Sequence, residues 1–162
     1  MRKYIGILVL FILIMLAAVG FGREREYDSV RIYFADAQIM KLIGVWTQVE
    51  KGDTETVANE VIETIIEGHD ENEKIRRVVP KVKNGMSVKV NDGVAYVDIK
   101  GEMQQKQEKS RDIEALAIYS IVNSLTGIDG IEAVNFTIDG MQKKDYAGFF
   151  DMRRIFTYNN IY

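Results

Sequence analysis

The sequence predicts an α+β fold, a single domain with two helices packed on one face of a small mixed sheet. Several segments alternate apolar and polar residues, the period of a strand, and two longer segments repeat apolar residues every three or four positions, the period of a helix. Their order along the chain is β(β)αββαβ. With 162 residues, 47% hydrophobic and 28% charged, the chain has the size and composition of one compact domain with an appendage.

The first half of the chain predicts one or two strands and a helix. Residues 30–35 alternate as a strand, and residues 45–50 form a weaker strand that ends at the turn 51–53. Asp53 or Thr54 can then cap a helix, and Gly68 suits the left-handed position that ends it. The apolar stripe of this helix consists of Val57, Ala58, Val61, Ile62, Ile65 and Ile66.

The second half predicts a hairpin, a second helix and further strands. Residues 86–90 and 94–99 alternate around Asn91-Asp92-Gly93, a strong hairpin signal. The polar residues 100–109 predict a surface loop. Ser110 or Asp112 starts the second helix and Gly127 stops it, and strands are expected at 132–138 and 155–158. The apolar face of the second helix consists of Ile113, Leu116, Ala117, Ser120, Ile121 and Leu125.

The N-terminus carries 19 uncharged residues, Tyr4 to Gly22, between Arg2-Lys3 and Arg23. As a helix this run is about 28 Å long, close to the ~30 Å hydrocarbon core of a bilayer. We therefore predict a transmembrane signal anchor or signal peptide at residues 1–22, a spacer at 23–28 and the domain at 29–162. An uncut anchor is favoured because the run exceeds the apolar core of a cleaved signal.

Composition excludes several classes of site. A net charge of −3 argues against a nucleic-acid partner, and the absence of cysteine excludes disulfides and thiolate zinc sites. His69 is the single histidine, and the nearby acids Asp70, Glu71 and Glu73 lie among basic residues. Phosphate-binding glycine loops and a nucleophile elbow are also absent. We therefore expect no catalytic, cofactor-binding or metal-binding residues.

Four segments of the chain resemble one family. They are "VRIYFADAQ" (30–38), "IVNSLT" (121–126), the "V-x-F-x-I-x-G" strand (134–140) and "DYAGFFDMRRIF" (145–156). Together they are similar to the GerMN domain of sporulation and spore germination proteins, over roughly residues 30–158. Its fold has been likened to the open sandwich called a ring-building motif. Ser124 and Thr126 match hydroxyl residues that end the family's helix. Ser124 replaces a threonine there and keeps a hydroxyl that can bond a carbonyl one turn earlier.

The resemblance implies a membrane-tethered, extracytoplasmic protein-interaction or assembly module, without catalysis or cofactor. It would act in sporulation, spore germination or envelope assembly. Its expected partners are envelope or sporulation-complex proteins, with a possible homo-oligomer, and the membrane through residues 4–22. The expected location is the cell membrane, single-pass with the domain outside, or exported if the segment is cleaved.

The alternative is a cell-wall-associated enzyme or a peptidoglycan-binding accessory. Asp36 and Asp98 each adjoin or lie in a strand and could converge as a pair of carboxylates, although turn capping explains each equally well. A glycan binder would expose a row of aromatic residues such as Trp46, Tyr96 and Tyr146.

The aromatic residues near the C-terminus suggest where a partner could bind. Tyr146, Phe149 and Phe150 lie within five residues, close to Arg153. Core packing accounts for most of these apolar residues, and those that face solvent would mark a contact surface. The predicted contact surface is therefore Tyr146, Phe149, Phe150 and Arg153.

Overall fold

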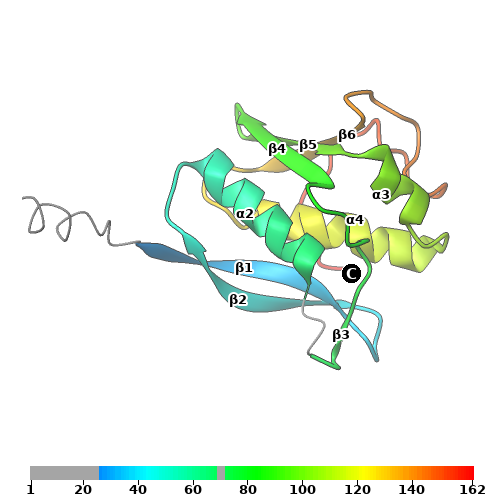
Figure 1. The fold of residues 1–162 in the computed structure, drawn as a ribbon, viewed down its shortest axis with the longest axis horizontal. Coiled ribbons are helices and arrows are strands. Elements are labelled where there is room, and N and C mark those ends of the chain that lie inside the picture. Colours follow the sequence, from blue (N-terminus) through cyan, green and yellow to red (C-terminus); the bar gives the residue numbers. More distant parts are fainter. Residues whose placement is uncertain (1–25, 69–71) are drawn as a thin grey trace, which may run out of the picture.

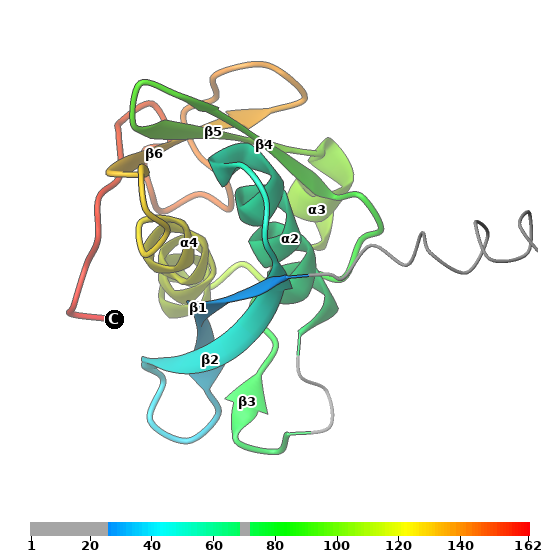
Figure 2. The same ribbon diagram turned by 90° about the vertical axis from the view of Figure 1, so that its left-hand side faces the viewer.

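The computed structural model describes residues 26–68 and 72–162. Two three-stranded sheets enclose a layer of helices (Figures 1 and 2). The elements are β1 (Tyr27–Asp36), β2 (Leu42–Glu50), α2 (Thr54–Glu67), β3 (Ile75–Arg76), β4 (Met86–Asn91), β5 (Val94–Ile99), α3 (Gly101–Lys106), α4 (Arg111–Leu125) and β6 (Ala133–Ile138).

The two sheets differ in how their strands pair. The first has the order β2-β1-β3 and is antiparallel throughout, with Arg31 of β1 opposite Trp46 of β2. The second has the order β4-β5-β6, with β4 and β5 antiparallel and β5 and β6 parallel. The second is therefore the mixed sheet of the predicted fold.

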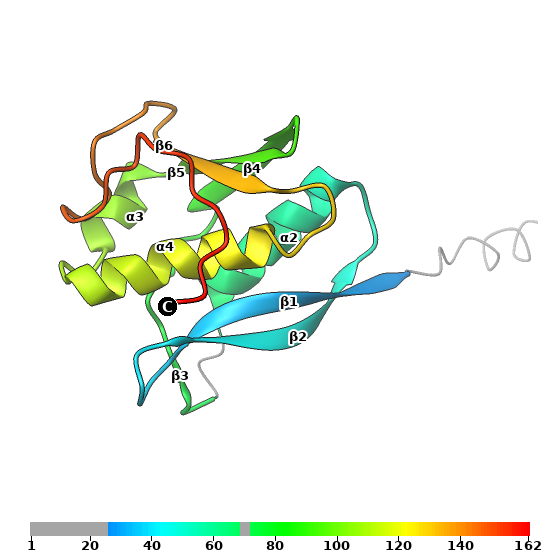
Figure 3. The same ribbon diagram turned by 180° about the vertical axis from the view of Figure 1, so that it is seen from behind.

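The structure confirms the α+β class and the order of elements, and both long helices lie against one face of the mixed sheet. It differs in having a second sheet, because β1 and β2 pair on the opposite side of the helix layer instead of joining the mixed sheet (Figures 1 and 3). A helix that is apolar all round needs cover on every side. The side chains of α4 are buried without interruption from Ile113 to Leu125, so an open sandwich would leave part of this helix exposed.

The predicted ends of α2 are confirmed. The side chain of Asp53 accepts a hydrogen bond from the Thr56 backbone N–H at 2.7 Å, and Gly68 has a positive φ of 65°. Arg77 donates to the carbonyls of Ile66 and Glu67, both at 2.7 Å. Both ends of the helix therefore have partners for backbone groups that the helix itself leaves unpaired.

The C-terminal segment packs on residues of α4 that lie outside its predicted apolar face. Tyr119 stacks on Tyr162 with a centroid distance of 4.9 Å and meets Phe150 and Phe156 edge-on. The side chain of Asn123 bonds both backbone groups of Asn159, at 2.8 and 2.9 Å. Figure 3 shows this segment crossing α4.

Three local predictions need correction. Residues 101–106 form helix α3 and not a surface loop, because Met103 and, just beyond the helix, Gln107 are buried in the core. Strand β1 begins at Tyr27, inside the predicted spacer. The strand predicted at 155–158 is reduced to one bridge between Phe156 and Val134, because the chain then turns toward Asn123 on α4.

The predicted N-terminal anchor, residues 1–22, lies outside the described residues. Among the helices of residues 26–68 and 72–162, none combines the length and the apolar composition needed to cross a bilayer.

Candidate functional site

A buried carboxylate on α4 organises the loop that carries the predicted contact residues. Glu114 is fully buried. Its Oε1 accepts hydrogen bonds from the backbone N–H of Ala147 at 3.0 Å and of Phe150 at 3.3 Å, and its Oε2 accepts from Phe149 N–H at 3.0 Å. A buried carboxylate must be compensated by donors, and three backbone N–H groups supply them here. The loop is therefore fixed to the central helix at three points.

Tyr146 lies inside the protein and not on the predicted contact surface. Its side chain is 5% exposed, and its hydroxyl donates to Oε1 of Gln107 at 3.1 Å. Burial, and secondarily the charge of Glu114, raises the pKa of Tyr146 well above its ordinary value. A phenol that is buried and bonded in this way anchors the loop to the core and cannot contact a partner.

Phe149 and Phe150 point to different environments. Phe149 is 52% exposed, whereas Phe150 is half-buried and packs edge-on against Tyr119 at 6.4 Å between centroids. Glu114 holds the backbone N–H groups of Ala147 and of both phenylalanines, so the two side chains keep these different environments. Phe149 is therefore the aromatic side chain that the loop presents to solvent.

Arg153 is exposed and paired with Asp151. Its Nε and Nη2 bond the two carboxylate oxygens of Asp151 at 2.9 and 2.7 Å. This pair holds the pKa of Asp151 well below its usual range and raises that of Arg153. Arg153 therefore reaches the surface as half of an ion pair.

Asp36 and Asp98, the two acids of the enzyme alternative, both accept hydrogen bonds from backbone groups of turns. Asp36 ends β1, and its Oδ1 accepts from the backbone N–H groups of Gln38 and Ile39 at 2.7 and 3.0 Å. Asp98 lies in β5, in the other sheet, where its Oδ1 accepts from the Thr137 hydroxyl at 2.6 Å and from Gly140 N–H at 2.7 Å. Each acid thus stabilises a strand end or a turn in a separate sheet.

The serines of α4 have structural bonds. The Ser120 hydroxyl donates to the carbonyl of Ala117 at 2.9 Å, and that of Ser124 donates to the carbonyl of Ser120 at 2.6 Å. Thr126 likewise bonds the carbonyl of Val122 at 2.8 Å. The predicted bond of Ser124 to a carbonyl one turn earlier is confirmed.

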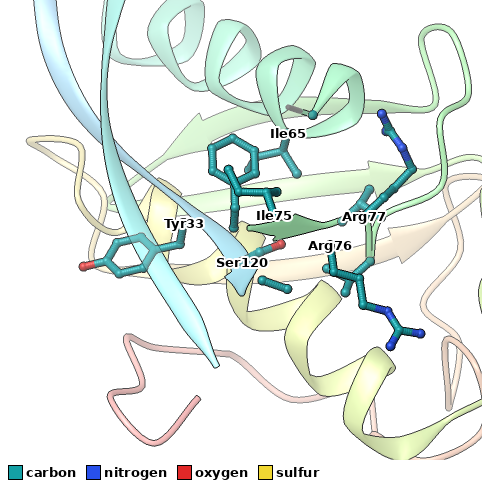
Figure 4. Close-up of a pocket in the computed structure, with 11 residues that line it drawn as sticks. Tyr33, Ile65, Ile75, Arg76, Arg77 and Ser120 are labelled. Carbon is teal, nitrogen blue, oxygen red and sulfur yellow. The ribbon is translucent and has the colours of Figure 1, made fainter. Parts of the chain in front are cut away.

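The other candidate sites are one small cavity, wider open hollows of about 480 and 450 Å³ beside Trp46 and Tyr158, and scattered acids. The small, partly open cavity between β1, α2 and α4, lined in part by Tyr33, Ile65 and Ser120, measures about 20 Å³ (Figure 4), roughly room for one water molecule. Within residues 26–68 and 72–162, no three His, Cys, Asp or Glu side chains lie where they could hold a metal ion. His69, Asp70 and Glu71 fall outside these ranges.

The row of aromatics expected of a glycan binder does not form. Trp46, 70% exposed, lies on β2 and Tyr96, 45% exposed, lies on β5 in the other sheet. Tyr146, the third member, is buried. These three side chains therefore cannot line one glycan-binding surface.

A family model described as "Germane: Sporulation and spore germination" matches residues 31–144. The chain belongs to this GerMN family. None of the curated proteins compared with it matches. The match begins within β1, covers the rest of both sheets and all described helices, and ends just before the loop held by Glu114.

Solved structures share the GerMN fold. The tandem GerMN domains of the sporulation protein GerM from Bacillus subtilis match with a TM-score of 0.63 and 18% identity, over 82% of this chain and 46% of that one. The first GerMN domain of the same protein gives 0.56 and 22%, over 78% and 98%. A chain from Clostridium perfringens described as a "Putative Lipoprotein" gives 0.58 and 18%, over 81% and 87%.

Sequence reasoning missed the residue that builds the site. Glu114 is the only charged residue between Ile113 and Leu125, and an acid inside such an apolar helix is a signal of a buried carboxylate with dedicated donors. The GerMN resemblance pointed to the 145–156 segment, but the pattern of that segment alone does not separate the inward Tyr146 from the outward Phe149.

Proposed function

We propose that this GerMN domain is a non-catalytic contact module, tethered to the cell membrane and facing outward, that serves sporulation, spore germination or envelope assembly. The observation that carries the proposal is the loop at 147–150, which a buried carboxylate fixes while Phe149 projects into solvent. Aromatic side chains held in a defined position are typical anchors of protein interfaces. A preformed loop also loses less conformational entropy on binding.

The contact surface that we propose consists of Phe149 and the neighbouring Arg153, without Tyr146. Phe149 supplies the apolar contact. The Asp151–Arg153 pair adds a polar border, as expected at the rim of an interface. The partner is an envelope or sporulation-complex protein.

Photo-crosslinking from position 149 tests the contact role. Phe149 is replaced by a photoreactive phenylalanine analogue in the full chain, and Tyr96, a comparably exposed aromatic on β5, serves as the matched control. Irradiation of cells should link position 149, and not position 96, to a defined protein. Equal labelling from both positions, or none from 149, would contradict the proposal.

The proposed tether is the uncharged segment Tyr4–Gly22, and the Clostridium perfringens chain described as a lipoprotein supports an extracytoplasmic place for such domains. Carbonate extraction and protease treatment of protoplasts test this assignment. The full-length chain should stay with the membrane and lose its domain to external protease. Release of the full-length chain by carbonate would rule out the tether, and release of a shortened chain would identify a cleaved signal.

A further inference from the structure

Most sheet edges of this protein are covered by other groups. On β4, the Asn59 side chain of α2 bonds both backbone groups of Val88 at 2.9 Å, and Glu55 accepts from Val90 N–H at 3.0 Å. These side chains occupy the positions that a further strand would use. The edge of β4 is thus closed to another chain.

The edges of β6 and β1 are covered as well. Phe156 exchanges two backbone hydrogen bonds of 2.8 Å with Val134 of β6. On the side of β1 away from β2, Tyr33 N–H donates to the Ser124 hydroxyl at 2.8 Å, and β3 pairs with the end of the strand.

Strand β2 is a long edge strand that the described residues leave uncovered over most of its length, and the register shows which of its groups face outward. Just beyond the two ends of β2, Lys51 N–H donates to the carbonyl of Glu26, and the carbonyl of Lys41 accepts from Asp36 N–H. The odd-numbered residues of β2 therefore exchange backbone hydrogen bonds with β1. In an antiparallel pair alternate residues point away from the partner. The even-numbered residues therefore direct their N–H and C=O groups to the free edge.

One of these outward residues is occupied, because Glu50 N–H donates to the Glu60 carboxylate of α2 at 2.8 Å. The other four have no backbone hydrogen-bond partner on that edge within the described part of the chain: Leu42, Gly44, Trp46 and Gln48. In Figures 1 and 3 this edge lies on the outside of the molecule.

The composition of β2 does not protect this edge. Residues 42–49 contain no charged residue and no proline, whereas protected edge strands carry such residues or are very short. Trp46 is 70% exposed. A strand of nine residues whose one charge is Glu50 at its end, with free backbone groups and an exposed indole, is suited to pairing with another strand.

We propose that β2 pairs antiparallel with β2 of a second copy of this chain, about a two-fold axis at Val45. This register pairs all four free residues with one another, Leu42 with Gln48 and Gly44 with Trp46 of the other copy. No like charges meet among the paired residues, because residues 42–48 carry none. The surface is thus self-complementary, as a two-fold interface requires.

The side chains at the centre fit this register. Gly44 has no side chain, and the Arg31 side chain lies over it so closely that an added Cβ would overlap it. In the pair, Trp46 of the second copy lies across from Gly44 on the same face as Arg31. The guanidinium and the indole are then neighbours, a favourable cation–π arrangement.

Cysteine crosslinking of the full-length chain tests the pairing, because the natural sequence has no cysteine. At the axis, two Val45→Cys residues form a non-hydrogen-bonded pair with Cα atoms about 4.5 Å apart, within disulfide range. In the same register two Gln48→Cys residues are roughly 20 Å apart. In mild detergent with an added oxidant, Val45→Cys should form a covalent dimer at least about tenfold faster than Gln48→Cys.

A charge-swap pair tests the register in the Val45→Cys background. Leu42→Lys with Gln48→Lys places like charges opposite each other and should slow crosslinking at least about tenfold, whereas Leu42→Lys with Gln48→Glu places opposite charges together and should preserve it. Circular dichroism verifies that both variants are folded. Equal rates for the two charge variants would overturn the proposal, as would Val45→Cys crosslinking no faster than Gln48→Cys. If the variants that contain Leu42→Lys do not fold, the comparison of Val45→Cys with Gln48→Cys still tests the proposal.

Discussion

At the scale of single residues, Glu114 determines the shape of the candidate site. Its two oxygens hold three backbone N–H groups of the 147–150 loop, and it is fully buried. Glu114→Ala should lower the free energy of unfolding by ~2–5 kcal/mol, because it leaves these donors unpaired and opens a cavity. Urea denaturation of residues 26–162 measures the loss.

Glu114→Gln is the matched control, since it keeps the volume and one accepting oxygen and should cost less than the alanine variant. Hydrogen exchange of the amides of Ala147, Phe149 and Phe150 should accelerate in Glu114→Ala before the sheets open. An alanine variant with unchanged stability and protected amides would show that the loop does not depend on this carboxylate.

The N-cap residue Asp53 leads to a prediction about how the stability of the protein changes at acidic pH. The Thr56 backbone N–H holds the pKa of Asp53 below its ordinary value. A lowered folded-state pKa means that the contribution to stability is present above the unfolded pKa of about 3.9 and is lost as the pH falls through the folded value. Asp53→Asn keeps the cap but cannot titrate.

Urea midpoints measured between about pH 5 and pH 3 should therefore fall more steeply for the natural chain than for Asp53→Asn. Asp36, whose pKa is lowered by the backbone N–H groups of Ile39 and Gln38, remains in both proteins and cancels in the comparison. Parallel curves for the two proteins would mean that the cap of α2 does not contribute in this range.

At the scale of elements, the layer formed by α2 and α4 is the core. Ile62 and Ile121 are buried on these helices, so truncating either to alanine should cost ~2–5 kcal/mol of unfolding free energy. Glu63→Ala, on the exposed side of α2, should stay within about 0.5 kcal/mol. Chemical denaturation compares the three variants, and an isoleucine variant as stable as Glu63→Ala would contradict this packing.

Periodicity predicted α2 well because its buried side chains share one stripe and its caps are local. Helix α3 escaped prediction because Met103 is its one buried residue. The division of the strands into two sheets could not be predicted either. The alternation within a strand indicates which of its faces is apolar, but it does not indicate which strand is its neighbour. The difference in burial between Tyr146 and Phe149 likewise depends on residues that are distant in sequence. Gln107 binds the Tyr146 hydroxyl, and Glu114 binds the backbone of residues 147–150.

At the scale of the whole molecule, the proposed function makes the domain a scaffold for a contact surface, and Asp36 and Asp98 bind turns. Asp36→Asn and Asp98→Asn each keep the oxygen that accepts the turn hydrogen bonds and remove the charge that catalysis would need. Phe149→Ser changes an exposed side chain and should alter stability little. Tyr96→Ser is the control for loss of an exposed aromatic elsewhere.

The most direct test is complementation of a deletion strain with these four variants, each verified to be folded and present at normal levels, with heat-resistant spores as the readout. We expect Asp36→Asn, Asp98→Asn and Tyr96→Ser to restore spore formation and Phe149→Ser to fail, because contact surfaces depend on a few anchors. If a folded Asp36→Asn or Asp98→Asn protein instead behaves like the deletion while Phe149→Ser restores spores, the contact account is wrong and the enzyme alternative replaces it.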